Sequence, residues 1–244
     1  CALPIWMGVL PRVARLSDLV ITVSNYSRQD IAEVLRIPQE KIRVTYEAPT
    51  VAKQPAERSE LLSQLSIGER GYIFALGAVD RRKNTGMLLR AFQQLRAETG
   101  TSLSLVMAGI ERPEAFASIA GDGVHLFTFL PDEVVAALYK HAVFFAYPSL
   151  YEGFGLPVLE AMSLGTPVLC SDSTSVGEVA GEAALKCNPV DINSLLVKMR
   201  QLLQSPGLRS ELIDLGYRRV REFSWERCAR QTLAVYNEVL GGSA

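Results

Sequence analysis

Two carboxylates flank a glycine-rich turn in the most informative stretch of this chain. Glu152 stands directly before residues 153–156, and Glu160 follows with seven residues between the two glutamates. Because the stretch comes after an apolar run at 142–146, we expect it at the carboxyl end of a strand, where parallel sheets bind ligands. Backbone amides near 154–156 would then open a helix and bind a phosphate. The two carboxylates would accept hydrogen bonds from hydroxyl groups on either side of that phosphate.

The glycines of this turn have a functional and a purely structural interpretation. Gly153 and Gly155 allow close backbone approach to a ligand, and Pro157 suits the first turn of a helix. On spacing alone, a plain strand–loop–helix connection with two surface glutamates explains the stretch equally well. A dinucleotide-binding fingerprint is excluded, because Val158 stands where the third glycine is required. An oxidoreductase is therefore disfavoured, and the absence of G-x-S-x-G disfavours an α/β-hydrolase.

A run of cations follows another predicted strand. Gly77 comes after the apolar run 72–76, and three consecutive cations at 81–83 stand directly before a helix with Asn84 or Thr85 as its N-cap. Cations are disfavoured at a helix N-terminus, so this placement favours a bound anion. The alternative is a solvated charged turn.

Strand and helix patterns alternate along almost the whole chain, which predicts an α/β fold with a parallel sheet. Strand-like runs occupy 19–23, 42–46, 72–76, 103–107, 124–127, 143–146, 167–170 and 184–186. Helical patterns occupy 24–35, 85–98, 112–120, 132–141, 156–164, 174–180, 191–204 and most of 206–240. The strands from residue 72 onward predict one Rossmann-like doubly wound sheet. The two earlier strands are too few for a complete sheet, so we expect a truncated remnant of a second domain there.

The first fifty residues carry further expectations. The chain opens on Cys1 rather than Met, and we expect a fragment whose first six residues match no pattern. Asn25 or Ser27 is the expected N-cap of the helix at 24–35. Residues 47–57, with two prolines and few apolar side chains, are expected to form a linker.

The last helix is expected to pack against this remnant. Ser224 is its expected N-cap, and its packing stripe would be Trp225, Ala229, Leu233 and Tyr236. Because two strands cannot cover their own faces, we expect incomplete burial of Leu19, Ile21 and Val23.

Composition limits the classes of function. The 244 residues carry 25 Lys+Arg against 26 Asp+Glu, a net charge of −1, and 48% are apolar. This hydrophobic content excludes disorder, and the charge balance does not predict a basic nucleic-acid-binding surface. No apolar run reaches the roughly 18–20 residues that cross a bilayer. The four cysteines are widely and irregularly spaced, which predicts neither a zinc site nor disulfides and favours a reducing cytoplasm.

Together these segments resemble a known family. Residues 152–162, E-G-F-G-L-P-V-L-E-A-M, resemble the Glu-x7-Glu signature of glycosyltransferase family 4. Those retaining nucleotide-sugar enzymes of the GT-B fold are also described as glycosyl transferases group 1. Residues 77–84 resemble the family's G-x-x-x-x-R-K-N phosphate loop. Individually weaker matches follow in the right order at 18–24, 41–47, 166–168, 178–179 and 223–226.

The resemblance implies a division into domains. Residues 71–222 would be a complete donor-binding domain, and residues 1–50 the end of the acceptor-side N-terminal domain. Residues 51–70 would be the linker and lead-in, and 223–244 a helix that crosses back. The acceptor site and the family's catalytic histidine would lie upstream of residue 1, so His125 and His141 are expected to be structural. The chain alone is therefore expected to bind the donor without transferring sugar.

The resemblance also implies roles for individual residues. In the loop that Gly77 opens, Arg82 and Lys83 would bind the donor diphosphate. Glu152 would contact the sugar hydroxyls and Glu160 the ribose. The other expected donor-binding positions are the backbone of Gly153, Phe154, Gly155 and Leu156, and Leu130 in the nucleobase loop 129–132.

Arg82, Lys83 and Glu152 are the expected catalytic residues, because they face the reacting phosphate and sugar. Two departures from the family pattern are Ala78 in place of an arginine and Gly177 in place of a proline before Glu178. Because Ala78 cannot bind phosphate as an arginine does, Arg82 and Lys83 would carry more of that binding. The substitution at Gly177 leaves it undecided whether Glu178 contacts the donor.

The implied activity is transfer of a hexose from a nucleotide-diphosphate sugar to a glycan or lipid-linked acceptor, with retention, in polysaccharide biosynthesis. The phosphate loop without its extra arginine favours GDP-mannose over UDP-sugars. No metal or other cofactor is expected, since the sequence lacks the Asp-x-Asp pair of metal-dependent sugar transferases. The implied location is cytoplasmic, with peripheral attachment to the inner membrane face through the absent N-terminal domain. The alternative is a donor-nucleotide-binding module without transferase activity of its own.

Overall fold

The chain forms two compact units, Cys1–Ala48 with Phe223–Ala244, and Pro49–Glu222. The computed structural model describes residues 3–50, 57, 63, 65, 67 and 71–241, with side chains from residue 8 onward. Residues 51–56 of the expected linker, and most of the lead-in up to residue 70, lie outside the described residues. Over the described ranges, no helix has the length and apolar character needed to cross a membrane.

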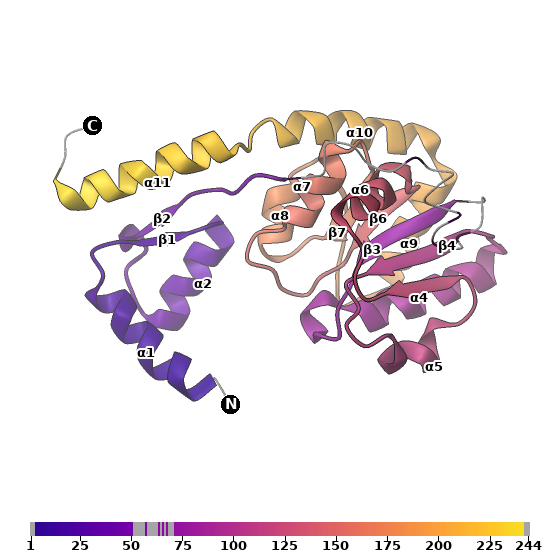
Figure 1. Ribbon diagram of the computed structural model, residues 1–244, viewed down its shortest axis with the longest axis horizontal. Helices are drawn as coiled ribbons and strands as arrows, with labels where there is room; N and C mark the ends of the chain where they lie inside the picture. Colours follow the sequence, from indigo (N-terminus) through magenta and orange to yellow (C-terminus); the bar gives the residue numbers. More distant parts are fainter. Residues whose placement is uncertain are drawn as a thin grey trace. The chain divides into compact units, whose positions relative to one another are not determined.

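Six parallel strands form the sheet of the larger unit, in the order β5-β4-β3-β6-β7-β8 (Figure 1). Their bounds are β3 Tyr72–Leu76, β4 Ser104–Ala108, β5 Val124–Phe127, β6 Phe144–Tyr147, β7 Val168–Ser171 and β8 Leu185–Cys187. The order starts at the centre and proceeds outward in both directions, which is the doubly wound Rossmann arrangement. The predicted fold class, α/β with a parallel sheet of six strands, is confirmed.

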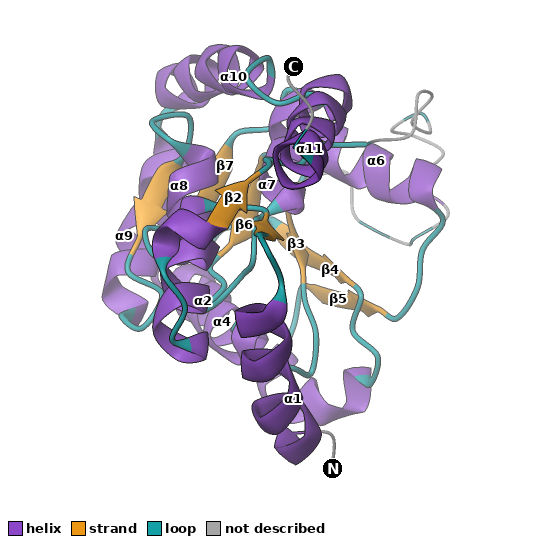
Figure 2. Ribbon diagram, turned by 90° about the vertical axis from the view of Figure 1, so that its left-hand side faces the viewer, coloured by secondary structure: helices purple, strands orange, loops and turns teal. Residues whose placement is uncertain are grey.

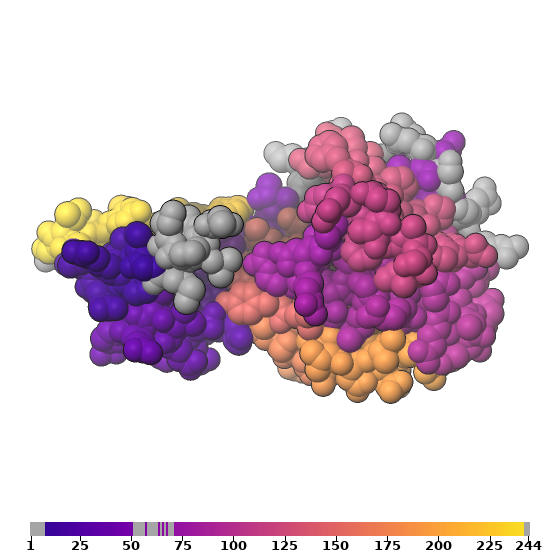
Figure 3. Space-filling model, turned by 90° about the horizontal axis from the view of Figure 1, so that it is seen from below, coloured from indigo at the N-terminus to yellow at the C-terminus, as the bar shows by residue number. Residues whose placement is uncertain are grey.

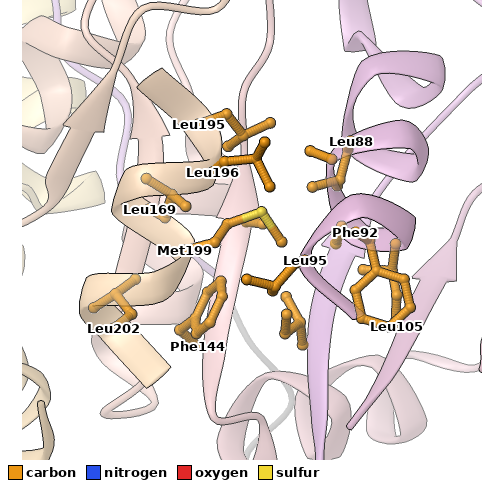
Figure 4. Packing of buried hydrophobic residues seen from close by; sticks show 14 of the residues in the cluster. Leu88, Phe92, Leu95, Leu105, Phe144, Leu169, Leu195, Leu196, Met199 and Leu202 are labelled. Atoms are coloured by element: carbon orange, nitrogen blue, oxygen red, sulfur yellow. The ribbon is translucent and has the colours of Figure 1, made fainter. Parts of the chain in front are cut away.

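Helices cover both faces of this sheet (Figure 2). Their bounds are α4 Thr85–Thr99, α5 Ala117–Ala120, α6 Asp132–His141, α7 Leu156–Ser163, α8 Thr174–Ala180, α9 Ile192–Gln204 and α10 Pro206–Val220. On one face, Leu88 and Leu95 of α4 approach Leu195 and Met199 of α9 beside Phe144 of β6 (Figure 4). All five side chains are buried, and each contributes about 1.5–3 kcal/mol through removal from water. This core holds the central strands in register.

The opposite face of the central strands carries a row of aromatic rings. Phe74 of β3 and Phe145 of β6 both contact Tyr139 of α6, with ring centroids 4.9 and 4.8 Å from it. Phe145 also stacks on Tyr147, the last residue of β6, at 5.6 Å. Tyr147 is 1% exposed, so the row fixes its ring at the carboxyl edge of the sheet.

Two helix boundaries differ from the sequence expectation. The N-cap of α2 is Ser24, not Asn25 or Ser27, because its hydroxyl accepts the hydrogen bond from the Ser27 amide at 3.0 Å. The expected helix 112–120 is divided into a 3-10 turn, Pro113–Phe116, and the short α5. Ser224 caps the last helix as expected, since its side chain accepts from the Arg227 amide.

The smaller unit contains α1 Leu3–Leu16, β1 Val20–Thr22, α2 Asn25–Leu35, β2 Ile42–Val44 and α11 Trp225–Leu240. Residues 3–6, which the sequence pattern left unassigned, belong to α1. The two strands pair in parallel, with Val20 opposite Ile42. The expected incomplete burial of Leu19, Ile21 and Val23 is confirmed, since all three are only half-buried.

The last helix, α11, lies against the N-terminal segment within this unit (Figure 3). Glu238 forms an ion pair with Arg43 of β2. The ring of Phe223 meets that of Tyr46 edge-on, with centroids 5.8 Å apart. These two contacts connect α11, and the residue before its N-cap, to the segment that contains β2.

The expected packing stripe of α11 is wrong. Val235 is 7% exposed and faces inward, whereas Trp225, Leu233 and Tyr236 are 49%, 58% and 57% exposed. Val235, rather than a residue of the stripe, is the side chain of α11 that is buried. Leu233 and Tyr236 line, with Val235, an apolar groove of about 550 Å³ that also includes Leu19 and Ile21, so they face the N-terminal segment without close packing.

Candidate functional site

The two charged loops found in the sequence meet where β3 and β6 lie side by side. Ile73 of β3 pairs with Phe144 of β6, so the loops at 77–84 and 148–155 leave the sheet next to each other. The strand order reverses at this point, and α/β sheets bind ligands outside the carboxyl ends of the strands there. The topology therefore places both loops at one candidate site.

Hydrogen bonds tie these loops together. The amide of Leu150 donates to the carbonyl of Arg82 at 2.7 Å. Asn84 Nδ2 donates to the carbonyls of Pro148, at 3.0 Å, and Pro189, at 2.7 Å. Asn84 occupies the N-cap position of α4 with a left-handed φ of 58°, but its side chain does not cap the helix. It braces three loops at the carboxyl edge of the sheet, a role that the sequence reasoning missed.

Lys83, Tyr147 and Glu152 form a closed triangle of hydrogen bonds. Lys83 Nζ lies 2.9 Å from Glu152 Oε1 and 2.8 Å from the Tyr147 hydroxyl, which donates to the same Oε1 at 2.7 Å. The Lys83 and Glu152 side chains are 31% and 16% exposed. Burial, and then the charge of Glu152, raise the pKa of Tyr147, so its hydroxyl keeps the proton that it donates. The residues predicted to bind phosphate and sugar are therefore in direct contact.

Arg82 points to a carboxylate of its own loop. Its Nε and Nη2 lie 2.9 and 2.6 Å from Asp80 Oδ2, and its amide donates to Asp80 Oδ1 at 2.9 Å. These hydrogen bonds lower the pKa of Asp80 to about 2. The hydrogen bond to Asp80, and the charges of Asp80 and the more distant Glu152, raise the pKa of Arg82. Both side chains of the pair are exposed, so water and salt weaken it and an incoming anion can displace Asp80.

The glycines of the two loops differ in whether a side chain could replace them. A Cβ on Gly77 would lie 2.4 Å from Ile110 Cδ1 and 2.9 Å from Met107 Cε, so this glycine permits close packing at the end of β3. Gly155 has a φ of 118°, which side chains disfavour. A Cβ on Gly153 would meet nothing within 4 Å. The backbone at Gly153 is therefore sterically open to a ligand.

The second glutamate lies inside α7. This helix begins at Leu156 with Pro157 in its first turn, so the amides near 154–156 lie at its N-terminus, where an anion is favoured. Glu160 accepts a hydrogen bond from the hydroxyl of buried Tyr139 at 3.2 Å. Partial burial raises the pKa of Glu160. The sequence located both glutamates but not their tyrosine partners: Tyr139 reaches Glu160 through packing of α6 on α7, whereas Tyr147 reaches Glu152 through the turn of the loop that follows β6.

Leu130 lies away from this cluster along the sheet. It follows β5, and β4 stands between β5 and β3 in the sheet order. Leu130 is half-buried, and its neighbour Phe129 is 82% exposed. The structure thus brings Lys83 and Glu152 together, turns the neighbouring Arg82 toward Asp80, and leaves the expected nucleobase loop at the sheet's outer edge.

The remaining chemistry-bearing residues contribute little to this site. Within the described ranges, no group of three or more His, Cys, Asp or Glu side chains is placed to hold a metal ion. Cys170 and Cys187 are free and buried, and burial raises the pKa of both thiols. His125 lies in β5, where burial lowers its pKa, and His141 ends α6. The site offers cations and helix amides for an anion, and carboxylates for hydroxyl groups.

Comparisons with a family model and with curated sequences agree on one family. The family described as Glycosyl transferases group 1 matches residues 57–219. O-antigen chain mannosyltransferase B of Escherichia coli is 35% identical over 230 residues, which cover 90% of this chain and 60% of that protein. MMP alpha-(1->4)-mannosyltransferase of Mycolicibacterium hassiacum is 35% identical over 249 residues, which cover 96% of this chain and 58% of that protein. The chain thus spans a little over half the length of these curated relatives.

Solved structures share the fold. Sucrose-phosphate synthase of Thermosynechococcus elongatus has a TM-score of 0.78 at 26% identity, over 97% of this chain and 62% of that one. WaaG, a glycosyltransferase involved in lipopolysaccharide biosynthesis, has a TM-score of 0.71 at 17% identity, over 91% of this chain and 62% of that one. Both are glycosyltransferases of the GT-B type, so the six-stranded unit has a GT-B architecture.

Proposed function

This chain belongs to the glycosyl transferases group 1 family, and we propose that its larger unit binds a nucleotide-diphosphate sugar for hexose transfer with retention, as in family 4. GDP-mannose is the proposed donor, a choice supported by two relatives named as mannosyltransferases. The proposed acceptor is a glycan or a lipid-linked glycan. The observation that carries the proposal is the direct contact of Lys83 with Glu152, in the loop that leads into the N-terminus of α7.

The proposed chemistry is electrostatic. A nucleoside diphosphate gains negative charge as the bond to the sugar stretches, and preorganised cations and amides stabilise that charge. In this proposal the cations are Arg82 and Lys83, the amides are those near 154–156, and no metal is needed. Glu152 positions the sugar through its hydroxyl groups and is not proposed as a covalent nucleophile. Glu160 is proposed to bind the ribose, and Leu130 with its backbone neighbours the nucleobase.

The proposed division of labour follows the two units. Residues 1–50 belong to an acceptor-side domain, 51–70 link it to the donor-binding domain at 71–222, and 223–244 form a helix that crosses back to the acceptor side. The compact units, which divide at Ala48 and at Glu222, support this assignment. We propose that the 244-residue chain binds donor but transfers no sugar, and that the whole enzyme works in the cytoplasm at the inner membrane face. The second candidate, a donor-binding module without transfer, makes the same binding prediction for this chain.

A thermal-unfolding screen tests the proposal. GDP, GDP-mannose, UDP, UDP-glucose and NAD⁺ are each added to the chain, and the free energy of unfolding is compared with that of the protein alone. A ligand at 100 times its dissociation constant stabilises the protein by about 2.7 kcal/mol. We expect GDP-mannose to stabilise the chain and NAD⁺ to have no effect. Stabilisation by NAD⁺ alone, or by none of the five, would contradict the proposal.

A further inference from the structure

Glu152 and a donor phosphate would share one cation. Lys83 Nζ lies 2.9 Å from Glu152 Oε1. A phosphate oxygen that accepts a hydrogen bond from the same ammonium lies about 2.8 Å from Nζ. Its distance from Oε1 is then at most about 6 Å, within the range at which charges in a partly buried site interact strongly. A diphosphate on Lys83 therefore either displaces Glu152 or lies beside its negative charge.

The free-energy cost of either outcome depends on which other hydrogen-bond donors reach the Glu152 carboxylate. Its side chain is 16% exposed, so water replaces the lost ammonium poorly. The hydroxyl groups of a sugar would donate to the carboxylate and offset that loss. A free nucleoside diphosphate brings no such donors.

The charge of the phosphate adds to the difference in binding between the nucleotide sugar and the free nucleoside diphosphate. In a nucleotide sugar, the phosphate next to the sugar has an ester bond to the sugar and an anhydride bond to the other phosphate, and carries one negative charge. In the free nucleoside diphosphate, the same phosphate is terminal, held by the anhydride bond alone, and carries about −1.5 to −2 charges at pH 7. The carboxylate therefore repels the free diphosphate more strongly than the intact donor.

We propose that Glu152 is a specificity-determining residue that disfavours the free nucleoside diphosphate relative to the intact nucleotide sugar, with Tyr147 as its positioning residue. This inference rests on the proposed function, because it assigns the sugar and the diphosphate to the same site. Its consequence is that Glu152 weakens binding of the product relative to the substrate, which favours release of the product after transfer.

The positioning role of Tyr147 follows from its contacts. Its ring is stacked on Phe145 at 5.6 Å, and its hydroxyl donates to Glu152 Oε1 at 2.7 Å. This donor remains when Lys83 turns to a phosphate, so the carboxylate stays aimed at the sugar. The Ser175 hydroxyl holds the Glu152 carbonyl at 2.7 Å, which fixes the backbone of the same residue.

Titration calorimetry on paired ligands tests the inference. GDP is compared with GDP-mannose, and UDP with UDP-glucose. The measured quantity is the ratio of the two dissociation constants within a pair, free diphosphate over nucleotide sugar. For Glu152→Gln we expect about three- to fivefold tighter binding of the free diphosphate, the size of a partly exposed ion-pair term, and a lower ratio. Glu182→Gln removes the same charge before β8, at the amino edge of the sheet, and should leave the ratio unchanged.

Tyr147→Phe keeps the stacked ring and removes only the hydroxyl. We expect it to weaken binding of the nucleotide sugar more than binding of the free diphosphate, and so to lower the ratio. In the Glu152→Ala background the same change should leave the ratio as it is, because the hydroxyl acts through the carboxylate. A further fall of the ratio in that background would overturn the role of Tyr147. Unchanged unfolding curves for the single variants show that a lower ratio is not a consequence of misfolding.

The outcomes separate this inference from the proposed function. If the wild-type chain binds nucleotides and Lys83→Ala weakens that binding, the phosphate site stands. Unchanged or weaker binding of the free diphosphate to Glu152→Gln would then overturn the specificity role of Glu152 alone. Failure of the wild-type chain to bind any of the four ligands would overturn both proposals.

Discussion

Asn84 donates a hydrogen bond from Nδ2 to the carbonyl oxygen of Pro148 at 3.0 Å, and so ties the loop that carries Lys83 to the loop that carries Glu152. The same Nδ2 reaches Pro189, in the loop after β8, at 2.7 Å. The spacing between the expected phosphate cations and the expected sugar carboxylate therefore depends on a residue that need not touch a ligand itself.

Replacing Asn84 should destabilise the larger unit. Asn84→Ala removes two hydrogen bonds, each worth about 1 kcal/mol, and puts alanine at a left-handed φ that costs roughly 1 kcal/mol more. Asn84→Gly loses the same hydrogen bonds without the backbone penalty. Urea denaturation should rank wild type above glycine and glycine above alanine, with a total loss of about 2–3 kcal/mol for alanine. Equal stability of all three proteins would show that the brace contributes nothing.

Two glycines in the loops should respond differently to alanine. Gly77→Ala places a Cβ 2.4 Å from Ile110 Cδ1, and such overpacking costs about 1–3 kcal/mol. Gly153→Ala meets nothing within 4 Å, so its stability should stay within about 0.5 kcal/mol of wild type. If a donor approaches the Gly153 backbone, the stabilisation by GDP-mannose should nevertheless fall in that variant. Thermal unfolding with and without the ligand measures both effects, and a stable Gly77→Ala protein would refute the packing argument.

Glu160 should make stability depend on pH in a defined direction. Burial raises its pKa in the folded protein above the ordinary value of 4.5, so the folded state binds its proton more tightly than the unfolded chain does. The stabilisation from that proton is complete below pH 4.5 and is lost as pH rises through the raised pKa. Glu160→Gln cannot lose a proton there, and its stability relative to wild type should therefore increase between pH 4 and pH 7. Denaturant unfolding at both values checks this, and a constant or falling difference would show that the carboxylate is not disfavoured by burial.

The elements of the larger unit follow from local sequence. Each buried strand is an apolar run of four or five residues, such as 72–76, and each helix repeats apolar residues at helical spacing. The residue at which a helix begins follows less directly from the sequence, because the cap depends on a single hydrogen bond. Ser24 caps α2, although Asn25 and Ser27 are equally good capping types. The close packing of the α11 stripe was predicted wrongly, because the contacts of this helix are with residues far away in sequence, such as the ion pair of Glu238 with Arg43, and local spacing does not encode them.

The candidate site was only partly readable from the sequence. Motif spacing identified the cations at 82–83 and the two glutamates as separate constellations. Their direct contact required β3 and β6 to be neighbours, and the sheet order is not encoded in any local pattern. The contributions of Tyr139 and Asn84 were missed for the same reason, because their partners belong to other elements, whereas Tyr147 contacts Glu152 in the loop that directly follows it. A tyrosine that ends a buried strand directly before a charged loop is the signal that would have indicated Tyr147.

Titration calorimetry of GDP-mannose, with GDP in parallel, on wild type and Lys83→Ala tests the central claim most directly. The claim predicts that Lys83→Ala weakens binding about ten- to a hundredfold, the effect of losing a charge-assisted hydrogen bond of roughly 1.5–3 kcal/mol. Lys140→Ala, which removes an exposed lysine near the end of α6, should bind both ligands as wild type does. Wild-type affinity in the Lys83→Ala protein would contradict the assignment of a donor phosphate to the loops that follow β3 and β6.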